Sequence, residues 1–297
     1  MSGLLAATYT PFDAAGQVRT DVIRPMVDHL IGQKISGLYV CGSTGEGMSM
    51  TTAERQAVTE AFVSATDGRV PVIVQVGHNS TADACQLASH AASAGADVIS
   101  ATCPSYFKPS DTQTLVKCIA EIAAAAPDKP FYYYHIPSLT GSTIDIVQFL
   151  ELGRNQIPNL VGLKYTDTKL FEYQTCQAAA GGALDIVFGS DEMLLGALAT
   201  GAQAAIGSTY NVIPEIYHRL MAAFEQGDLP EARRQQLKSI EFIRTVYRYP
   251  FHSAMKEILN MQGFPVGTCR LPQRSLTAEE IQSLKSDLKA IGFELPS

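Results

Sequence analysis

The chain has 297 residues, of which 46% are hydrophobic and 17% charged, and its formal net charge is −7. This composition supplies a large apolar core and excludes an intrinsically disordered chain. The acidic balance, with no basic cluster, argues against a nucleic-acid partner or an anionic membrane surface. No apolar run approaches the ~20 residues of a membrane span, and the opening residues do not resemble a secretory signal.

Short apolar runs alternate with helical stretches along the chain. The expected strands cover residues 4–9, 37–40, 70–76, 98–101, 131–135, 160–164, 185–188 and 204–206. Amphipathic helices are expected between them, for example at 52–66, 82–94, 112–126 and 144–152. Eight such alternations favour an α/β fold of the (β/α)₈ TIM-barrel type. The alternative is an open doubly wound sheet, which lacks support because no G-x-G-x-x-G follows the first strand.

Helices continue beyond the last barrel helix, which is expected at 214–226. The further candidates lie at 230–248, 251–261 and 278–290. No linker rich in Pro, Gly or Ser separates them from the barrel. We therefore predict a catalytic barrel domain over residues 1–227 and a C-terminal helical extension, 228–297, packed on the barrel.

Three helix starts match the capping-box pattern, in which a side chain and the backbone satisfy each other's free groups. The matches are Thr51-x-x-Glu54, Ser110-x-x-Gln113 and Thr277-x-x-Glu280. The sequence therefore predicts that Thr51, Ser110 and Thr277 each cap a helix.

The cysteines and histidines show no ligand-like spacing. Six cysteines are scattered without a C-x-x-C pair, which in a chain of this length indicates free thiols in a reducing, cytoplasmic compartment. The histidines form no H-x-H or H-x-x-x-H pair, so the sequence predicts no metal site. We expect His135 to be a hydrogen-bonded structural residue, with a polar group at a pocket mouth as the alternative.

Lys164 ends the run Leu160-Val161-Gly162-Leu163-Lys164, which indicates a buried parallel strand. An α/β barrel gathers its catalytic groups at the carboxyl ends of its strands. Burial there disfavours the ammonium form, lowers the pKa and leaves a neutral amine that can attack a carbonyl. The alternative is a strand-end lysine whose charged head reaches solvent.

A glycine-rich loop, Gly42-Ser43-Thr44-Gly45-Glu46, follows the second expected strand. Glycines allow successive N–H groups to converge on an anion, and the hydroxyls of Ser43 and Thr44 add donors that suit a carboxylate. An ordinary strand-to-helix turn is the alternative.

Tyr134 lies near the end of the fifth expected strand, one βα unit before Lys164. Its phenol is placed to relay protons, whereas Tyr132 and Tyr133 are candidates for packing, which is also the alternative for Tyr134. Together, the lysine, the phenol and the loop predict Schiff-base chemistry on a 2-keto acid. The lysine forms an imine at the keto carbon, the loop holds the acid group, and the protonated imine accepts electrons from the adjacent carbon–carbon bond.

At these motifs the chain resembles the dihydrodipicolinate synthase / N-acetylneuraminate lyase family of class I aldolases. The matching segments are Tyr9-Thr10-Pro11-Phe12, Gly42–Glu46, Tyr134–Gly141, Gly162–Lys164 and Gly207-Ser208-Thr209. The resemblance implies a (β/α)₈ barrel with a helical extension, a homotetramer, and neither cofactor nor metal. It implies that Lys164 is the Schiff-base lysine and Tyr134 the phenol of a proton relay. Ser43 and Thr44 would bind the pyruvyl carboxylate, Ser43 also serving the relay, and Gly207 would lie beside the pyruvyl group.

Several segments resemble the lyase branch of the family. They are Tyr132–Gly141, Gly162–Asp167 and Gly189-Ser190-Asp191-Glu192. In the synthases an arginine occupies the position of Leu139 and binds the carboxylate of the aldehyde substrate, so its absence speaks against that activity. The residues expected by resemblance to hold the hydroxylated tail of a sugar acid are Thr166, Gly189, Asp191, Glu192 and Ser208, with Phe251 also lining the pocket. The alternative for Asp191 and Glu192 is to complement a helix dipole.

The resemblance thus implies a carbon–carbon lyase that cleaves N-acetylneuraminate to pyruvate and N-acetylmannosamine. One alternative is another aldolase or dehydratase of the family, such as a dihydrodipicolinate synthase or a 2-keto-3-deoxy sugar acid aldolase. A catalytically silent, effector-binding barrel is a second, but such a protein would be expected to have lost Lys164 or Tyr134. Tyr106 matches a position that reaches a neighbouring subunit in the synthases, although packing explains it equally well.

Overall fold

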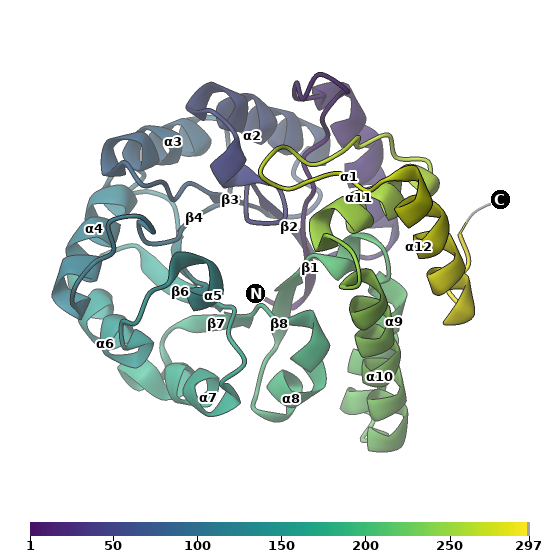
Figure 1. The fold of residues 1–297 in the computed structure, drawn as a ribbon. Helices are drawn as coiled ribbons and strands as arrows, with labels where there is room; N and C mark the ends of the chain where they lie inside the picture. The colour runs from purple at the N-terminus through teal and green to yellow at the C-terminus, as the bar shows by residue number, and fades with distance from the viewer. Residues whose placement is uncertain (296–297) are drawn as a thin grey trace.

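The computed structural model describes residues 1–295. Eight parallel strands form a closed barrel in sequence order, and β8 pairs with β1 (Figure 1). The strands are β1 (Gly3–Ala7), β2 (Gly37–Val40), β3 (Val72–Gln75), β4 (Val98–Ala101), β5 (Phe131–His135), β6 (Leu160–Tyr165), β7 (Asp185–Phe188) and β8 (Ala204–Gly207). The predicted (β/α)₈ barrel is therefore confirmed, and the open sheet is excluded. Two expected strands were too long, because β1 ends at Ala7 and β3 begins only after Pro71, which has no N–H to pair.

Helices surround the barrel on its outer side (Figure 1). They are α1 (Ile23–Gly32), α2 (Thr52–Thr66), α3 (Thr81–Ser93), α4 (Thr112–Ala124), α6 (Ile146–Gln156), α7 (Leu170–Ala178), α8 (Leu194–Ala199) and α9 (Pro214–Glu225). The short helix α5 (Pro137–Thr140) lies instead over the opening of the barrel (Figure 1). The capping boxes at Thr51 and Thr277 are present. The one predicted at Ser110 is wrong, because the Asp111 side chain caps α4 by accepting the N–H of Thr114 at 2.8 Å. A carboxylate one residue closer to the helix is the better placed acceptor.

The C-terminal helices are α10 (Leu229–Val246), α11 (Phe251–Met261) and α12 (Ala278–Ala290). They lie together on one side of the barrel, where α10 packs along α9 (Figure 1). The domain division between residues 227 and 228 stays a prediction, and the last two residues of the range 228–297 lie outside the described residues. Within residues 1–295, none of the helices has the length and apolar character to cross a bilayer.

Side chains alternate between two cores. Those on one face of the strands fill the barrel interior, as Tyr132 and Tyr134 do, whereas Tyr133 joins the larger core between strands and helices. This alternation follows from the two-residue period of a strand. At the carboxyl end of the strands, the inner core is bounded by Ala7, Tyr134, Ile136 and Ile206. Polar side chains at the ends of these strands gather above it.

Candidate active site

Lys164 occupies the second-last position of β6 and is buried. Its Nζ atom lies 3.9 Å from the ring centroid of Tyr39 and 4.1 Å from that of Tyr134. Burial lowers the pKa of Lys164 to about 7, although the carboxylate of Asp191 acts in the opposite direction. A large fraction of the amine is therefore neutral near neutral pH, as a nucleophile requires.

Tyr134 is the register partner of Lys164 in the β5–β6 ladder, so the two side chains leave the sheet side by side. Burial raises the pKa of Tyr134 to about 12, against the opposing effect of the nearby hydroxyls of Ser43 and Thr166. The phenol is therefore protonated at neutral pH. It is suited to pass a proton between neighbouring hydroxyls, and it is a poor base by itself.

The loop after β2 turns sharply and brings Ser43 and Thr44 to the mouth of the barrel. Glu46 adopts a left-handed conformation with φ 55°, and a Cβ at Gly47 would overlap the carbonyl oxygen of Cys41. Thr10, three residues beyond β1, fixes the loop by donating its hydroxyl to the Gly45 carbonyl at 2.7 Å. The tight turn thus explains why glycine is needed here and why both hydroxyls face one cavity.

At the end of this loop, two N–H groups are already hydrogen-bonded within the protein and cannot bind an anion. Glu46 N–H donates to the Ser43 carbonyl and Gly47 N–H to the Gly42 carbonyl, both at 3.1 Å. Any carboxylate would therefore be held by the earlier part of the loop, where Ser43 and Thr44 line the cavity.

Asp191 follows β7 in a short 3₁₀ turn and is buried. Its Oδ2 accepts from the Thr209 N–H at 2.9 Å and from the Thr209 hydroxyl at 2.6 Å. Its Oδ1 has no hydrogen-bond partner among residues 1–295 and points to Gly207, where a Cβ would overlap it. Burial raises the pKa of Asp191 to about 6. Oδ2 thus holds the loop after β8, and Oδ1 remains available to a ligand.

Thr166, the residue after β6, offers a second such atom. Its Oγ1 is buried without a partner of hydrogen-bond geometry among the described residues, and a Cβ at Gly189 would overlap it. Glycine at position 189 therefore makes room for this hydroxyl at the cavity wall. A buried hydroxyl without a partner is a natural contact for a polar ligand.

These side chains share one cavity of about 410 Å³. Every predicted site residue lines it: Ser43, Thr44, Tyr134, Lys164, Thr166, Gly189, Asp191, Glu192, Gly207, Ser208 and Phe251. Sequence reasoning had not singled out Ser138, Asp167, Tyr247 or His252, which also line it. For His252 the available signal was its place beside Phe251 at the start of α11.

A buried ion pair connects the loop to the C-terminal extension. Lys256 of α11 lies 2.6 Å from Glu46, and neither side chain is exposed. Glu46 also accepts the N–H of Arg270 at 2.8 Å, and Lys256 donates to the Thr268 carbonyl at 3.1 Å. The extension therefore contributes Phe251 and His252 to the cavity and also anchors the loop that carries Ser43.

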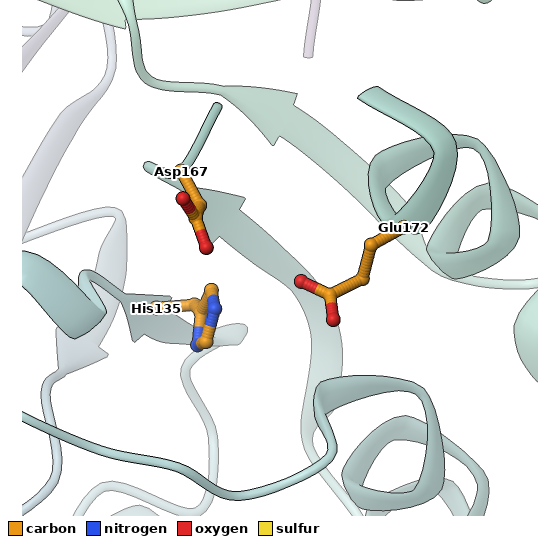
Figure 2. Close-up of side chains that lie close together, drawn as sticks. All are labelled: His135, Asp167 and Glu172. Atoms are coloured by element: carbon orange, nitrogen blue, oxygen red, sulfur yellow. The ribbon is translucent and has the colours of Figure 1, made fainter. Parts of the chain in front are cut away.

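His135, Asp167 and Glu172 point toward one another (Figure 2), and of these three Asp167 also lines the cavity. The carboxylates already have partners, since Asp167 pairs with Lys169 at 3.1 Å and Glu172 accepts the Tyr165 hydroxyl at 2.7 Å. Burial lowers the pKa of His135 to about 4, and its ring stacks on Tyr165 with centroids 5.4 Å apart. His135 is not among the residues that line the cavity, which favours a structural role. The expected side-chain hydrogen bond is not found among residues 1–295, and stacking on Tyr165 holds the ring instead.

Known proteins similar to this chain belong to one enzyme family. A model of the dihydrodipicolinate synthetase family matches residues 1–291. The chain is 42% identical to an N-acetylneuraminate lyase of Xenopus tropicalis, over 97% of this chain and 93% of the relative. The structure superposes on the N-acetylneuraminate lyase of Proteus mirabilis with a TM-score of 0.96 and 39% identity, covering 99% of both chains. That of Aliivibrio salmonicida gives 0.96 and 38%, covering 99% of this chain and 98% of the other. The chain belongs to the dihydrodipicolinate synthetase family.

Proposed function

We propose that this protein is an N-acetylneuraminate lyase, which cleaves its substrate reversibly to pyruvate and N-acetylmannosamine. The observation that carries this proposal is the buried amine of Lys164, placed against the phenol of Tyr134 at the floor of a sugar-sized cavity. The relatives in frogs and bacteria with 38–42% identity are N-acetylneuraminate lyases. Leu139 supports the same assignment, because an apolar side chain lines the cavity where the synthases carry arginine.

The reaction begins at the keto carbon of the open-chain sugar acid. Ser43 and Thr44 hold its carboxylate, which places the keto carbon at the Nζ atom of Lys164. The neutral amine adds to this carbon, the keto oxygen leaves as water after taking up protons, and a protonated imine remains on Nζ. Because the cavity positions both groups beforehand, the addition proceeds as an intramolecular step.

Cleavage then needs a proton to leave the hydroxyl on the carbon two positions beyond the imine carbon. The proton passes to Tyr134, which hands its own proton on to Ser43, while the bond between the hydroxyl-bearing carbon and the carbon attached to the imine carbon breaks. The relay later returns one proton to that second carbon, which has become the terminal carbon of the enamine. The electron pair of the bond moves toward the imine nitrogen and forms a neutral enamine, and N-acetylmannosamine departs as the aldehyde. Protonation of the enamine and hydrolysis of the imine release pyruvate and restore Lys164.

The hydroxylated tail of the substrate lies toward the rim. Oδ1 of Asp191 and the Thr166 hydroxyl are buried polar atoms available to hydrogen-bond it. Glu192 and Ser208 line the same wall, and Phe251 offers an apolar face from α11. Charged acceptors form stronger hydrogen bonds with hydroxyls than neutral ones do.

The test is incubation with N-acetylneuraminate and assay of pyruvate and N-acetylmannosamine. Borohydride reduction in the presence of pyruvate should add a stable pyruvyl-derived mass at Lys164, and Lys164→Ala should lose both the adduct and the activity. Lys238→Ala, which changes an exposed lysine of α10, is the matched control and should behave as wild type. An active Lys164→Ala variant would contradict the mechanism, and efficient turnover of aspartate semialdehyde would contradict the lyase assignment.

We also propose a cytoplasmic homotetramer, on the basis of the family resemblance. The six cysteines are free thiols, which suits a reducing compartment. Tyr106 and Phe107 expose 78% and 85% of their surface as an aromatic pair, which suits contact with another subunit. Light scattering that shows an active monomer at assay concentration would contradict the tetramer.

A further inference from the structure

The reactive nitrogen of Lys164 lies between two aromatic faces. One belongs to Tyr134, to which the mechanism above assigns a role, and the other to Tyr39 of β2. Tyr39 is the nearer of the two, with its ring centroid 3.9 Å from Nζ, and it is buried inside the barrel. No step of the proposed reaction so far uses Tyr39.

Several contacts fix the Tyr39 ring. Its hydroxyl is hydrogen-bonded to Oγ of Ser100 on β4 at 3.0 Å. It meets the ring of Tyr134 edge to face, with centroids 5.5 Å apart and an interplanar angle of 78°. On the loop side, a Cβ at Gly42 would lie only 2.8 Å from its Cε1. One ring therefore touches the lysine, the relay phenol and the loop that carries Ser43.

We propose that Tyr39 is a further positioning residue of this site, whose ring face stabilises the positive charge at Nζ and supports Tyr134. The inference rests on the proposed function, because it concerns the protonated imine. When the neutral amine, a proton and the keto acid combine to form the imine and water, the positive charge remains on the nitrogen between the rings. The face of an aromatic ring attracts a cation, and the attraction is larger in a site without water.

This role has a pH dependence that mere packing would not produce. At high pH the free amine is neutral and only the imine is charged, so removing the ring weakens imine formation by the full cation–ring attraction. At low pH the free amine is already an ammonium, which the ring also stabilises. Removing the ring then destabilises the free protein and the imine by similar amounts, so pyruvate affinity changes little. The same attraction favours the ammonium form, so removing the ring makes Lys164 more acidic.

Other titratable groups also face this space. The charge of Asp191 acts on Lys164, and that of Arg55 acts on Tyr39 from the loop side. The other titratable groups of the cavity wall are Tyr134, Asp167, Glu192, Tyr247 and His252. They are common to wild type and variants. The ratio of variant to wild-type pyruvate affinity is therefore taken at each pH, because the contributions of these groups cancel in that ratio.

The experiment measures pyruvate affinity by calorimetry near pH 9 and near pH 5.5 for wild type, Tyr39→Leu and Tyr39→Phe. Tyr39→Leu should bind pyruvate roughly 5- to 30-fold more weakly near pH 9 and within about 3-fold of wild type near pH 5.5. Tyr39→Phe keeps the ring face and loses only the hydrogen bond to Ser100. Its pyruvate affinity should therefore stay within about 3-fold of wild type at both pH values. Equal losses at both pH values in Tyr39→Leu, or an equally weak Tyr39→Phe, would overturn the proposal.

A second measurement separates this proposal from the proposed function. The pKa of the Lys164 amine is obtained without pyruvate, from the pH dependence of its acylation followed by peptide mass, and should fall by roughly one unit in Tyr39→Leu. An unchanged pKa would overturn the role of Tyr39 even if wild type forms the imine. A shifted pKa in a protein that never forms the imine would instead reject the lyase assignment. Tyr173→Leu is the matched control, because it removes a buried tyrosine of α7 in the outer core and should leave the Lys164 pKa unchanged.

Discussion

The ion pair between Glu46 and Lys256 gives the strongest prediction about stability. Nζ and Oε1 are 2.6 Å apart and both side chains are fully buried. Lys256→Met retains most of the side-chain volume and leaves the Glu46 carboxylate buried with the Arg270 N–H as a donor. Removing one partner of such a pair typically costs about 3–5 kcal/mol. A large domain loses roughly 2–4 °C in Tm per kcal/mol, so we expect Tm to fall by roughly 6–20 °C.

A double-mutant cycle in urea tests this reasoning. We expect Lys256→Met and Glu46→Gln each to lower the free energy of unfolding strongly, and the double variant to lose less than the sum, since it contains no unpaired buried charge. Arg219→Met is the matched control, because Arg219 pairs with Glu215 on the surface of α9 and such pairs contribute about 0–1 kcal/mol. If Lys256→Met loses no more than Arg219→Met, the pair does not anchor the loop.

Further predictions concern the reaction. Tyr134→Phe should lower turnover by about 10²–10⁴-fold while pyruvate imine formation persists. The control, Tyr133→Phe, changes a ring in the outer core and should keep wild-type turnover. If Tyr134→Phe also keeps wild-type turnover, Tyr134 has only a packing role. Because only the neutral amine reacts and the pKa of Lys164 is about 7, kcat/KM should fall as pH drops below 7. Asp191→Asn should shift this decline to lower pH, since the carboxylate raises that pKa; a decline that stays in place would contradict the coupling. Asp191→Ala should impair turnover of N-acetylneuraminate more than pyruvate imine formation, whereas equal losses would mean that it only holds the Thr209 loop.

Much of the fold and of the candidate site was predictable because both follow from local sequence. Apolar runs of strand length alternating with amphipathic helices specify a barrel, whose closure brings all the strand ends to one side. A residue near the end of a strand, such as Lys164, or just after one, such as Ser43 or Asp191, must therefore lie at that face. For this reason the expected site residues at and after the strand ends line one cavity, which Phe251 reaches from α11.

Boundaries and caps were less predictable. Ser110 and Asp111 are both good capping residues by type, and only the backbone path decides which one faces the free N–H groups of α4. The strand expected at 70–76 had to shorten because Pro71 cannot donate to the barrel ladder. These differences arise where two local signals compete within one or two residues.

Tertiary structure alone decided which side chains meet from distant positions. In the sequence, Tyr39 is only one of several residues of a buried strand. Its ring contacts Lys164 only because the strands close into a barrel. Glu46 and Lys256 become partners only because α11 returns to the loop after β2. The sequence by itself determined the strands, the helices and the side of the barrel on which reactive groups end. Distances, burial and hence the pKa of Lys164 were decided by tertiary packing, because desolvation depends on neighbours that the local pattern does not identify.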